Sequence, residues 1–294
     1  MIKLYIVPQP GHFPERGGVR EHLLQLYNAA ANHPSIKLVT REDNADIVHV
    51  ESSYKSRDRV DTFCCHGGFL PDKIPSVLAN LRDAKVIVSV AKWIADDFFP
   101  QYSNKTIVIP NGVKLDEWDN LPPSGLEPGY VLYAKEIEYW IKDFVQVVLS
   151  SPTMRFVTTV WPNALKVPKN LTVIGLQTHD AMKSIVKDAG CLLLTGPEVC
   201  PTMLLEAWAC EVPVVANYLG GAKELLTCNG GLLYTKVEEL RGCLTQCLSH
   251  PNRELMGVAG RQQVEARYQW KDLFEQYVWV YENILEGTTD AIFK

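Results

Sequence analysis

Short apolar runs rich in β-branched residues alternate with amphipathic stretches along the whole chain. Continuous runs of this kind are typical of parallel strands that are covered on both faces. They predict strands at residues 3–8, 36–40, 45–50, 61–67, 85–91 and 105–112, and again at 129–136, 155–161, 171–176, 191–196 and 212–218. Amphipathic periodicity predicts helices at residues 19–32, 93–99, 143–150, 178–187, 203–210, 237–249 and 272–285. The alternation predicts an α/β fold with doubly wound parallel sheets.

The pattern pauses at residues 114–129, where three prolines and two glycines stand among acidic residues. This composition is typical of a linker. A chain of 294 residues is long for one hydrophobic core and suits two domains. We therefore predict a first domain over residues 1–118 and a second over residues 119–271.

Composition narrows the class of protein. With 47% hydrophobic and 21% charged residues the chain is an ordinary globular protein, and a net charge of −5 gives no basic field for nucleic acid. The N-terminus reads as a buried strand rather than a signal peptide, and no apolar run approaches the roughly 18 residues of a membrane span. Eight cysteines form no CxxC pair, as expected for reduced thiols in a cytoplasmic protein.

The segment "TGPEVCPTMLLEAWAC" places two glutamates, Glu198 and Glu206, in very apolar surroundings. Charges rarely occupy such positions unless they are paired or bind a ligand. The proline at Pro201 suits the first turn of a helix, whose N-terminus at the end of a strand is a site for an anion. The amides expected to face that anion are those of Thr202, Met203 and Leu204.

Carboxylates on either side of an anion site can accept hydrogen bonds from sugar hydroxyls, so the segment suits a nucleotide diphosphate sugar. The structural alternative is that Glu198 caps the helix and Glu206 pairs with a buried cation. No GxGxxG follows a strand and no GxxxxGK[ST] occurs, so a nicotinamide enzyme and a P-loop NTPase lose their main sequence support.

This segment resembles the signature of GT-B glycosyltransferases of the large retaining family four. The matching features are Glu198, Pro201, "LEA" at 205–207, "PVV" at 213–215, and Gly220, Gly221 and Glu224. Elsewhere, Gly17 and Gly18 resemble the family's glycine turn, where backbone amides approach the donor phosphates. His66 resembles the family histidine near the transferred sugar, and residues 268–285 resemble the helix that crosses back to the first domain. The resemblance thus sets residues 272–294 apart as a third segment.

The resemblance implies two Rossmann-like domains that face a central cleft. It implies a retaining transfer from a UDP- or GDP-sugar to an acceptor hydroxyl, without a metal and without a cofactor. In this interpretation Glu198 and His66 contact the sugar and Glu206 contacts the ribose. The departing diphosphate would be stabilised by preorganised charge from Lys142, Lys135, the amide of Gly18 and the helix amides after Pro201.

The chain departs from the family pattern at several positions. The family's Gly-Arg is Ala134 and Lys135 here, and lysine lacks the bidentate fork of arginine. Lys142 is the best match to the later family lysine. Glu211 replaces a glycine after "AC". His179 and Asp180 follow a predicted strand where the family binds the base, although Asp180 could equally cap a helix.

Two other functions remain open at this point. One is a nucleotide-sugar isomerase of the 2-epimerase type, whose acid and base in the first domain would come from Glu15, Glu21 or Glu51. The other is a non-catalytic subunit that binds a nucleotide sugar. The acceptor also remains open among glycan, lipid and small molecule, with nucleic acid disfavoured by the acidic charge.

Overall fold

The computed structural model describes residues 1–15, 17–55, 59–67, 71–135 and 140–293. The chain forms two compact units, of which unit 1 comprises Met1–Gly112 and Tyr268–Lys294 and unit 2 comprises Val113–Arg267. The predicted boundaries after residues 118 and 271 differ from these for a physical reason. Trp118 packs on His179 of unit 2, and Trp270 packs on His22 of unit 1.

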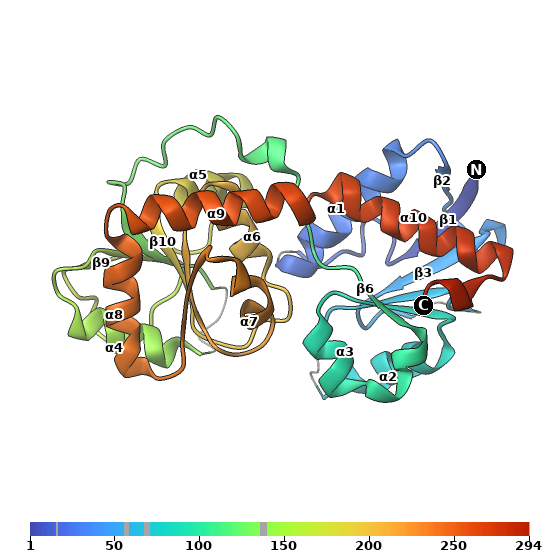
Figure 1. Cartoon of the computed structure of the whole chain (residues 1–294), viewed down its shortest axis with the longest axis horizontal. Coiled ribbons are helices and arrows are strands. Elements are labelled where there is room, and N and C mark those ends of the chain that lie inside the picture. Colours follow the sequence, from blue (N-terminus) through green and yellow to red (C-terminus); the bar gives the residue numbers. More distant parts are fainter. Residues whose placement is uncertain (16, 56–58, 68–70, 136–139, 294) are drawn as a thin grey trace. The chain divides into compact units, whose positions relative to one another are not determined.

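Unit 1 is built on a parallel sheet whose described strands have the order β2-β1-β3-β4-β5-β6. These strands are β1 (Ile2–Val7), β2 (Ile36–Leu38), β3 (Ile47–Glu51), β4 (Thr62–Cys65), β5 (Val86–Ser89) and β6 (Thr106–Val108). The helices are α1 (Gly18–Asn32), α2 (Ile74–Asp83), α3 (Lys92–Phe98) and α10 (Trp270–Glu286), with 3-10 turns η1 (Glu42–Asn44), η2 (Pro100–Lys105) and η5 (Thr289–Ala291). Helix α10 packs beside α1 although the two lie near opposite ends of the sequence (Figure 1).

Unit 2 repeats this architecture with the described strand order β12-β11-β10-β7-β8-β9, again parallel. The strands are β7 (Tyr130–Tyr133), β8 (Phe156–Thr158), β9 (Leu171–Val173), β10 (Ala189–Leu194), β11 (Val214–Asn217) and β12 (Gly231–Tyr234). The helices are α4 (Ile141–Ser150), α5 (His179–Lys187), α6 (Thr202–Ala209), α7 (Gly221–Leu225), α8 (Val237–Leu248) and α9 (Asn252–Arg267), with 3-10 turns η3 (Leu115–Trp118) and η4 (Leu226–Cys228).

The central strands of both sheets are completely buried. All residues of β3 and β4 in unit 1, and of β7 and β10 in unit 2, are inaccessible to solvent or nearly so. In unit 2 the Tyr133 ring stacks on Phe144 of α4 with 4.2 Å between ring centroids. Because β3 and β4 are covered on both faces, their polar residues must find partners inside the protein.

Every predicted strand and helix overlaps an observed one, and the predicted α/β class is confirmed. The prediction missed α2, α7, α9 and β12. Helix α9 buries little beyond Gly257, Gly260 and Val264, so its sequence carries almost no apolar periodicity. Among the described residues, no helix is both long and apolar enough to cross a membrane.

Candidate functional site

The loop after β10 leads directly into α6, at the carboxyl end of the unit 2 sheet. Helix α6 begins after Pro201, and its residues from Leu204 to the last turn are buried. The amide of Leu204 donates to the Pro201 carbonyl at 3.1 Å, so this amide already has an acceptor within the protein. The first amides of a helix have no acceptor within it, which leaves those of Thr202 and Met203 as the candidate donors to an anion.

Glu198 is held in place by the two glycines of the "GG" motif. The amide of Gly221 donates to the Glu198 carbonyl at 2.7 Å, and Glu198 forms a parallel β-bridge with Gly220. A Cβ atom on Gly220 would lie 2.4 Å from that carbonyl oxygen, and one on Gly221 would lie 1.8 Å from the carbonyl oxygen of Val199. Only glycine permits this close approach, so the motif fixes the backbone that presents Glu198.

The side chain of Glu198 forms an ion pair with Lys135, which lies just after β7. Their side chains are 31% and 18% exposed, so the pair lies at the edge of the core rather than inside it. Burial lowers the pKa of Lys135. The Lys135 backbone is fixed by Thr159, whose hydroxyl accepts from the Lys135 amide at 2.8 Å and donates to its carbonyl at 2.5 Å.

Glu206 lies inside α6 and is only 6% exposed. Its Oε1 lies 3.1 Å from Nε2 of His179 at the start of α5. The His179 ring in turn packs edge-on against Trp118, with centroids 5.8 Å apart. Lys183 lies over Trp118 and forms an ion pair with Glu117 at 3.3 Å. Sequence reasoning identified Glu206 and His179 but missed Trp118, which lies in the segment interpreted as a linker.

Two details of unit 2 correct alternatives raised by the sequence, and a third describes a departure from the family pattern. Within the described residues no side chain caps α6, so the capping alternative for Glu198 is wrong. Helix α5 is capped by Thr178, whose hydroxyl accepts from the Ala181 amide at 3.2 Å, and Asp180 lies in the first turn instead. Glu211, which replaces the family glycine, has a φ of +56°, the left-handed conformation that glycine adopts most easily.

The remaining predicted residues lie elsewhere. Lys142 is exposed in the first turn of α4, and in the described part of the chain no hydrogen bond or ion pair joins it to Lys135 or Glu198. Gly17 precedes α1 with a φ of +93°, and Gly18 is the exposed first residue of that helix. Both glycines belong to unit 1. The structure thus brings Lys135, Glu198 and the start of α6 together, and it places Lys142 apart from their contacts.

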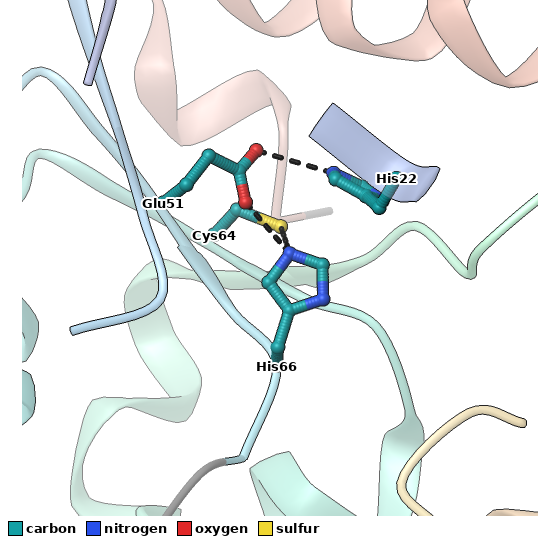
Figure 2. Close-up of side chains that lie close together, drawn as sticks. All are labelled: His22, Glu51, Cys64 and His66. Atoms are coloured by element: carbon teal, nitrogen blue, oxygen red, sulfur yellow. Dashed lines mark hydrogen bonds and ion pairs between the residues drawn. The ribbon is translucent and has the colours of Figure 1, made fainter. Parts of the chain in front are cut away.

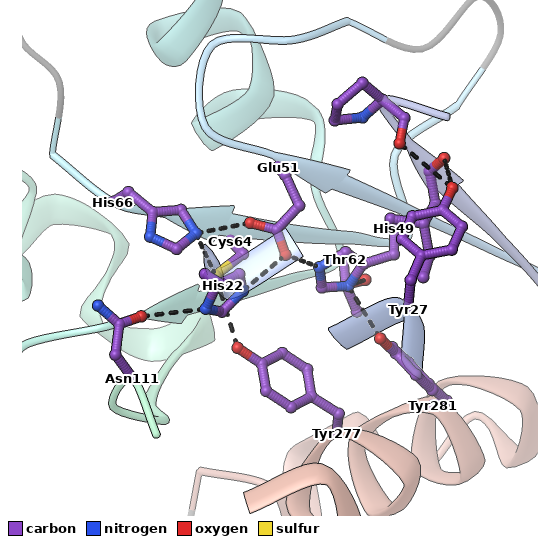
Figure 3. A network of polar contacts seen from close by, with 12 residues as sticks. His22, Tyr27, His49, Glu51, Thr62, Cys64, His66, Asn111, Tyr277 and Tyr281 are labelled. Carbon is purple, nitrogen blue, oxygen red and sulfur yellow. Dashed lines mark hydrogen bonds and ion pairs between the residues drawn. The ribbon is translucent and has the colours of Figure 1, made fainter. Parts of the chain in front are cut away.

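His66 belongs to a buried polar network in unit 1 that is centred on Glu51 (Figure 3). The Glu51 carboxylate is completely inaccessible to solvent and lies against three imidazole rings. Nε2 of His66 lies 2.6 Å from Oε2, and Nε2 of His49 and of His22 lie 2.7 and 3.2 Å from Oε1. Sequence reasoning gave His66 as a single residue and missed this network.

A second ring of polar groups holds these histidines. Nδ1 of His22 lies 3.0 Å from Oδ1 of Asn111. Nδ1 of His49 lies 2.7 Å from the Thr62 hydroxyl and 3.0 Å from the hydroxyl of Tyr281 on α10. Because two hydroxyls can donate to its Nδ1, His49 donates its Nε2 proton to Glu51. The network therefore joins β3, β4, α1 and α10.

Charges within this network are strongly perturbed. Burial alone would raise the pKa of Glu51, but the His22 and His66 rings and hydrogen bonds from His22 and His49 hold that pKa well below its usual range. Burial and the neighbouring His22 lower the pKa of His66, against the opposing effect of Glu51. Burial and Glu51 raise the pKa of the Cys64 thiol, whose sulfur lies 3.5 Å from Nε2 of His66.

Comparisons with known proteins agree with this fold. Residues 144–278 match the model of the family described as "Glycosyl transferase-like". The chain is 43% identical over 166 residues to a GDP-mannose-dependent monoacylated alpha-(1-6)-phosphatidylinositol monomannoside mannosyltransferase of Corynebacterium glutamicum. That alignment covers 50% of this chain and 42% of the relative, so the matched part spans less than half of the relative's length.

Solved structures extend the likeness across both units. Anabaena HepE in complex with UDP-glucose is 13% identical with a TM-score of 0.74, covering 96% of this chain and 100% of that one. Sucrose-phosphate synthase from Thermosynechococcus elongatus is 15% identical with a TM-score of 0.71, covering 84% and 75%. The two Rossmann-like units are those of the GT-B fold. The matched family model and the mannosyltransferase relative add a likeness in sequence to glycosyltransferases over about half of the chain.

Proposed function

We propose that the chain transfers a sugar from a nucleotide diphosphate sugar to an acceptor hydroxyl, with retention of anomeric configuration and without a metal in the transfer step. The observation that carries this proposal is the arrangement of Lys135, Glu198 and the first turn of α6 at the carboxyl end of the unit 2 sheet. Ligands of open α/β sheets bind at that edge.

The diphosphate of the donor is assigned to the start of α6 and to Lys135. The amides of Thr202 and Met203 and the helix dipole favour an anion there. A diphosphate carries more negative charge than the carboxylate of Glu198, so Lys135 gains a stronger partner when the donor binds. The Glu198 oxygens then become available to accept from hydroxyls of the sugar. Lys142, an exposed residue in the first turn of α4, adds a second positive charge for the phosphates.

Glu206 and its neighbours are assigned to the nucleoside. A buried carboxylate that already accepts from His179 can accept further bonds from the two ribose hydroxyls. The rings of Trp118 and His179 lie beside that carboxylate and supply aromatic surface against which a nucleoside can pack. This assignment explains why a charged residue persists at a position that is 6% exposed.

The transfer itself breaks the bond between the anomeric carbon and the diphosphate oxygen and forms a bond from that carbon to the acceptor oxygen. The nucleoside diphosphate leaves with the bonding electron pair, and its departing oxygen takes the proton of the acceptor hydroxyl. The negative charge that develops on the leaving group lies where the α6 amides and Lys135 are already oriented, so they stabilise the transition state without reorganising. A direct contact of His66 or of the Gly18 amide with the donor stays a prediction.

GDP-mannose is the donor to examine first. The relative whose name specifies GDP-mannose is 43% identical in its matched part, whereas the structure with UDP-glucose is 13% identical. The acceptor stays open among glycan, lipid and small molecule.

Release of nucleoside diphosphate from GDP- and UDP-sugars tests this proposal, with sugar products resolved by chromatography and NMR. We expect one donor to be turned over, slowly with water alone and faster with an acceptor, and its turnover to be lost in Glu198→Ala. A product with the same base but an epimerised sugar would instead identify an isomerase. If a nucleotide sugar binds but is not turned over with any of the acceptor mixtures tested, the chain is a non-catalytic subunit.

A further inference from the structure

The buried network of unit 1 contains a set of side chains with the chemistry of a metal centre. His22, Glu51, Cys64 and His66 each direct one donor atom toward the others, and all four atoms lie within 4.8 Å of one another (Figure 2). All four residues are buried. The set offers two imidazole nitrogens, one thiolate and one carboxylate oxygen, which are the ligand types of zinc in proteins.

We propose that unit 1 binds one zinc ion through His22, Glu51, Cys64 and His66, as a closed structural site. This proposal does not depend on the donor contacts assigned to unit 2, and the transfer step itself is proposed without a metal. It is an alternative to the predicted contact of His66 with the transferred sugar.

The local backbone favours these ligands. Cys64 and His66 are two residues apart at the end of β4, so their side chains point to the same face of the strand. Glu51 is the last residue of the neighbouring β3, and His22 comes from α1. Two adjacent strand ends and one helix thus enclose a single point, which is how a rigid scaffold presents a metal site.

The spacing of the four ligand atoms suits a tetrahedral ion after shifts of the side chains. Zinc–ligand bonds of about 2.0–2.3 Å place neighbouring ligand atoms roughly 3.3–3.8 Å apart. Nε2 of His66 lies 3.5 Å from Sγ of Cys64, and Nε2 of His22 lies 3.2 Å from Oε1 of Glu51. The 2.6 Å between His66 and Glu51 must lengthen, and the widest separation of up to 4.8 Å must shorten.

The net charge of the site and the hydrogen bonds around its ligands also suit a zinc ion. A divalent ion with one carboxylate, one thiolate and two neutral imidazoles is a neutral unit, which lowers the cost of burying it. Asn111 accepts from Nδ1 of His22, so Nε2 is left to bind the ion. His49 donates to Glu51, and the Tyr277 hydroxyl lies 3.6 Å from the Cys64 sulfur, where it can donate to a thiolate. Such outer contacts are typical of zinc ligands.

The competing arrangement holds protons instead of zinc. His22 would then donate from both nitrogens, to Asn111 and to Glu51, and would be a buried cation paired with a buried carboxylate. The two arrangements differ in metal content and in the state of the Cys64 sulfur, so both can be measured directly.

The test uses the full chain, expressed with added zinc and purified without chelators or metal-affinity columns. Elemental analysis should give one zinc per chain, and replacement by Co²⁺ should give a sulfur-to-cobalt charge-transfer band in the near ultraviolet with the visible bands of a tetrahedral ion. Cys64→Ser should abolish that band and remove most of the zinc. Tyr277→Phe should weaken zinc affinity by about 10- to 100-fold, the usual effect of losing an outer contact.

Cys65→Ser is the matched control, because Cys65 is equally buried in the same strand but faces the opposite side. It should keep both the zinc and the cobalt band. If Cys64→Ser does not fold, the cobalt spectrum of the natural chain still decides. Absence of bound zinc together with absence of the charge-transfer band would overturn the proposal in favour of the protonated network. A band that persists in Cys64→Ser would overturn it as well, because the ion would then lie elsewhere.

Discussion

Two glutamates, Glu51 in unit 1 and Glu198 in unit 2, lie at the carboxyl ends of their sheets but have opposite surroundings. Glu51 is inaccessible to solvent and lies against three histidine rings. Glu198 is 31% exposed and has one charged partner, Lys135. The carboxylate of Glu51 is enclosed by groups of the protein, whereas the partly exposed carboxylate of Glu198 can exchange its partner for a ligand from solvent.

The difference separates two uses of the same residue type. A carboxylate enclosed by fixed donors stabilises the fold, because removing any partner leaves an uncompensated buried group. A carboxylate at the edge of the core contributes little to stability, because solvent screens its ion pair. The contrast predicts large effects on folding at Glu51 and large effects on turnover at Glu198.

The largest effect on stability is expected for Glu51→Ala. This change leaves three histidines around an apolar side chain, and breaking a buried ionic group of this kind costs about 3–5 kcal/mol. Urea denaturation would measure the loss. Glu198→Ala serves as the comparison and should change the free energy of unfolding by less than about 1 kcal/mol. Equal losses in the two variants would contradict the distinction between them.

Glu198→Ala should instead reduce turnover of the donor by about 100-fold, which corresponds to about 2.7 kcal/mol of transition-state stabilisation. The reason is the loss of a carboxylate contact to the transferred sugar. Steady-state kinetics on purified, fully folded protein would measure it. Unchanged turnover in this variant, alongside an active natural chain, would remove Glu198 from the site.

Gly221→Ala should disturb the loop that carries Glu198. Its Cβ would lie 1.8 Å from the Val199 carbonyl oxygen, so the backbone of 198–199 must shift, at a cost of about 1–3 kcal/mol and with a loss of donor turnover. Gly242→Ala is the matched control, because Gly242 lies inside α8 with no atom within 4 Å of the new Cβ. There the alanine should stabilise the helix by about 0.5–1 kcal/mol.

The smallest effect is expected for Glu211→Gly. Glu211 has a φ of +56°, and this conformation destabilises a non-glycine residue by about 1–2 kcal/mol. Glycine removes that strain, but it loses more conformational entropy on folding, which destabilises the folded state by about 0.5–1 kcal/mol. The variant should therefore be more stable by about 0.5 kcal/mol. Thermal denaturation that shows a loss of stability would mean that the Glu211 side chain makes a stabilising contact that outweighs the strain.

The parallel strands could be predicted because each is a compact apolar run whose pattern needs no distant partner. Strand β12 was missed because "GLLY" is short, begins with Gly231 and is preceded by a second glycine, Gly230. Glu198 and Glu206 could be found because a charge inside an apolar segment is visible in the sequence itself. Their neighbour Trp118 was missed because its contact with His179 depends on the folded path of residues 113–129.

The network around Glu51 could not be read from the sequence for a related reason. Its members come from segments as far apart as α1, β3, β4 and α10, and no local pattern links His22 to Tyr277. His66 was identified through family resemblance, and Glu51 was named only as a possible acid or base of an isomerase. The sequence signal that could have helped is the number of polar residues inside β3 and β4, strands that otherwise read as fully buried.

The assignment of the donor site to unit 2 is tested most directly by calorimetric titration of the natural chain and of Glu206→Ala with GDP and UDP, in buffer free of divalent cations. We predict that one nucleotide binds the natural chain without any metal and that Glu206→Ala weakens it by about tenfold or more, since a hydrogen bond to a charged group contributes about 1.5–3 kcal/mol. Equal affinity of both proteins, or no binding of either nucleotide, would contradict the assignment of the donor site to unit 2.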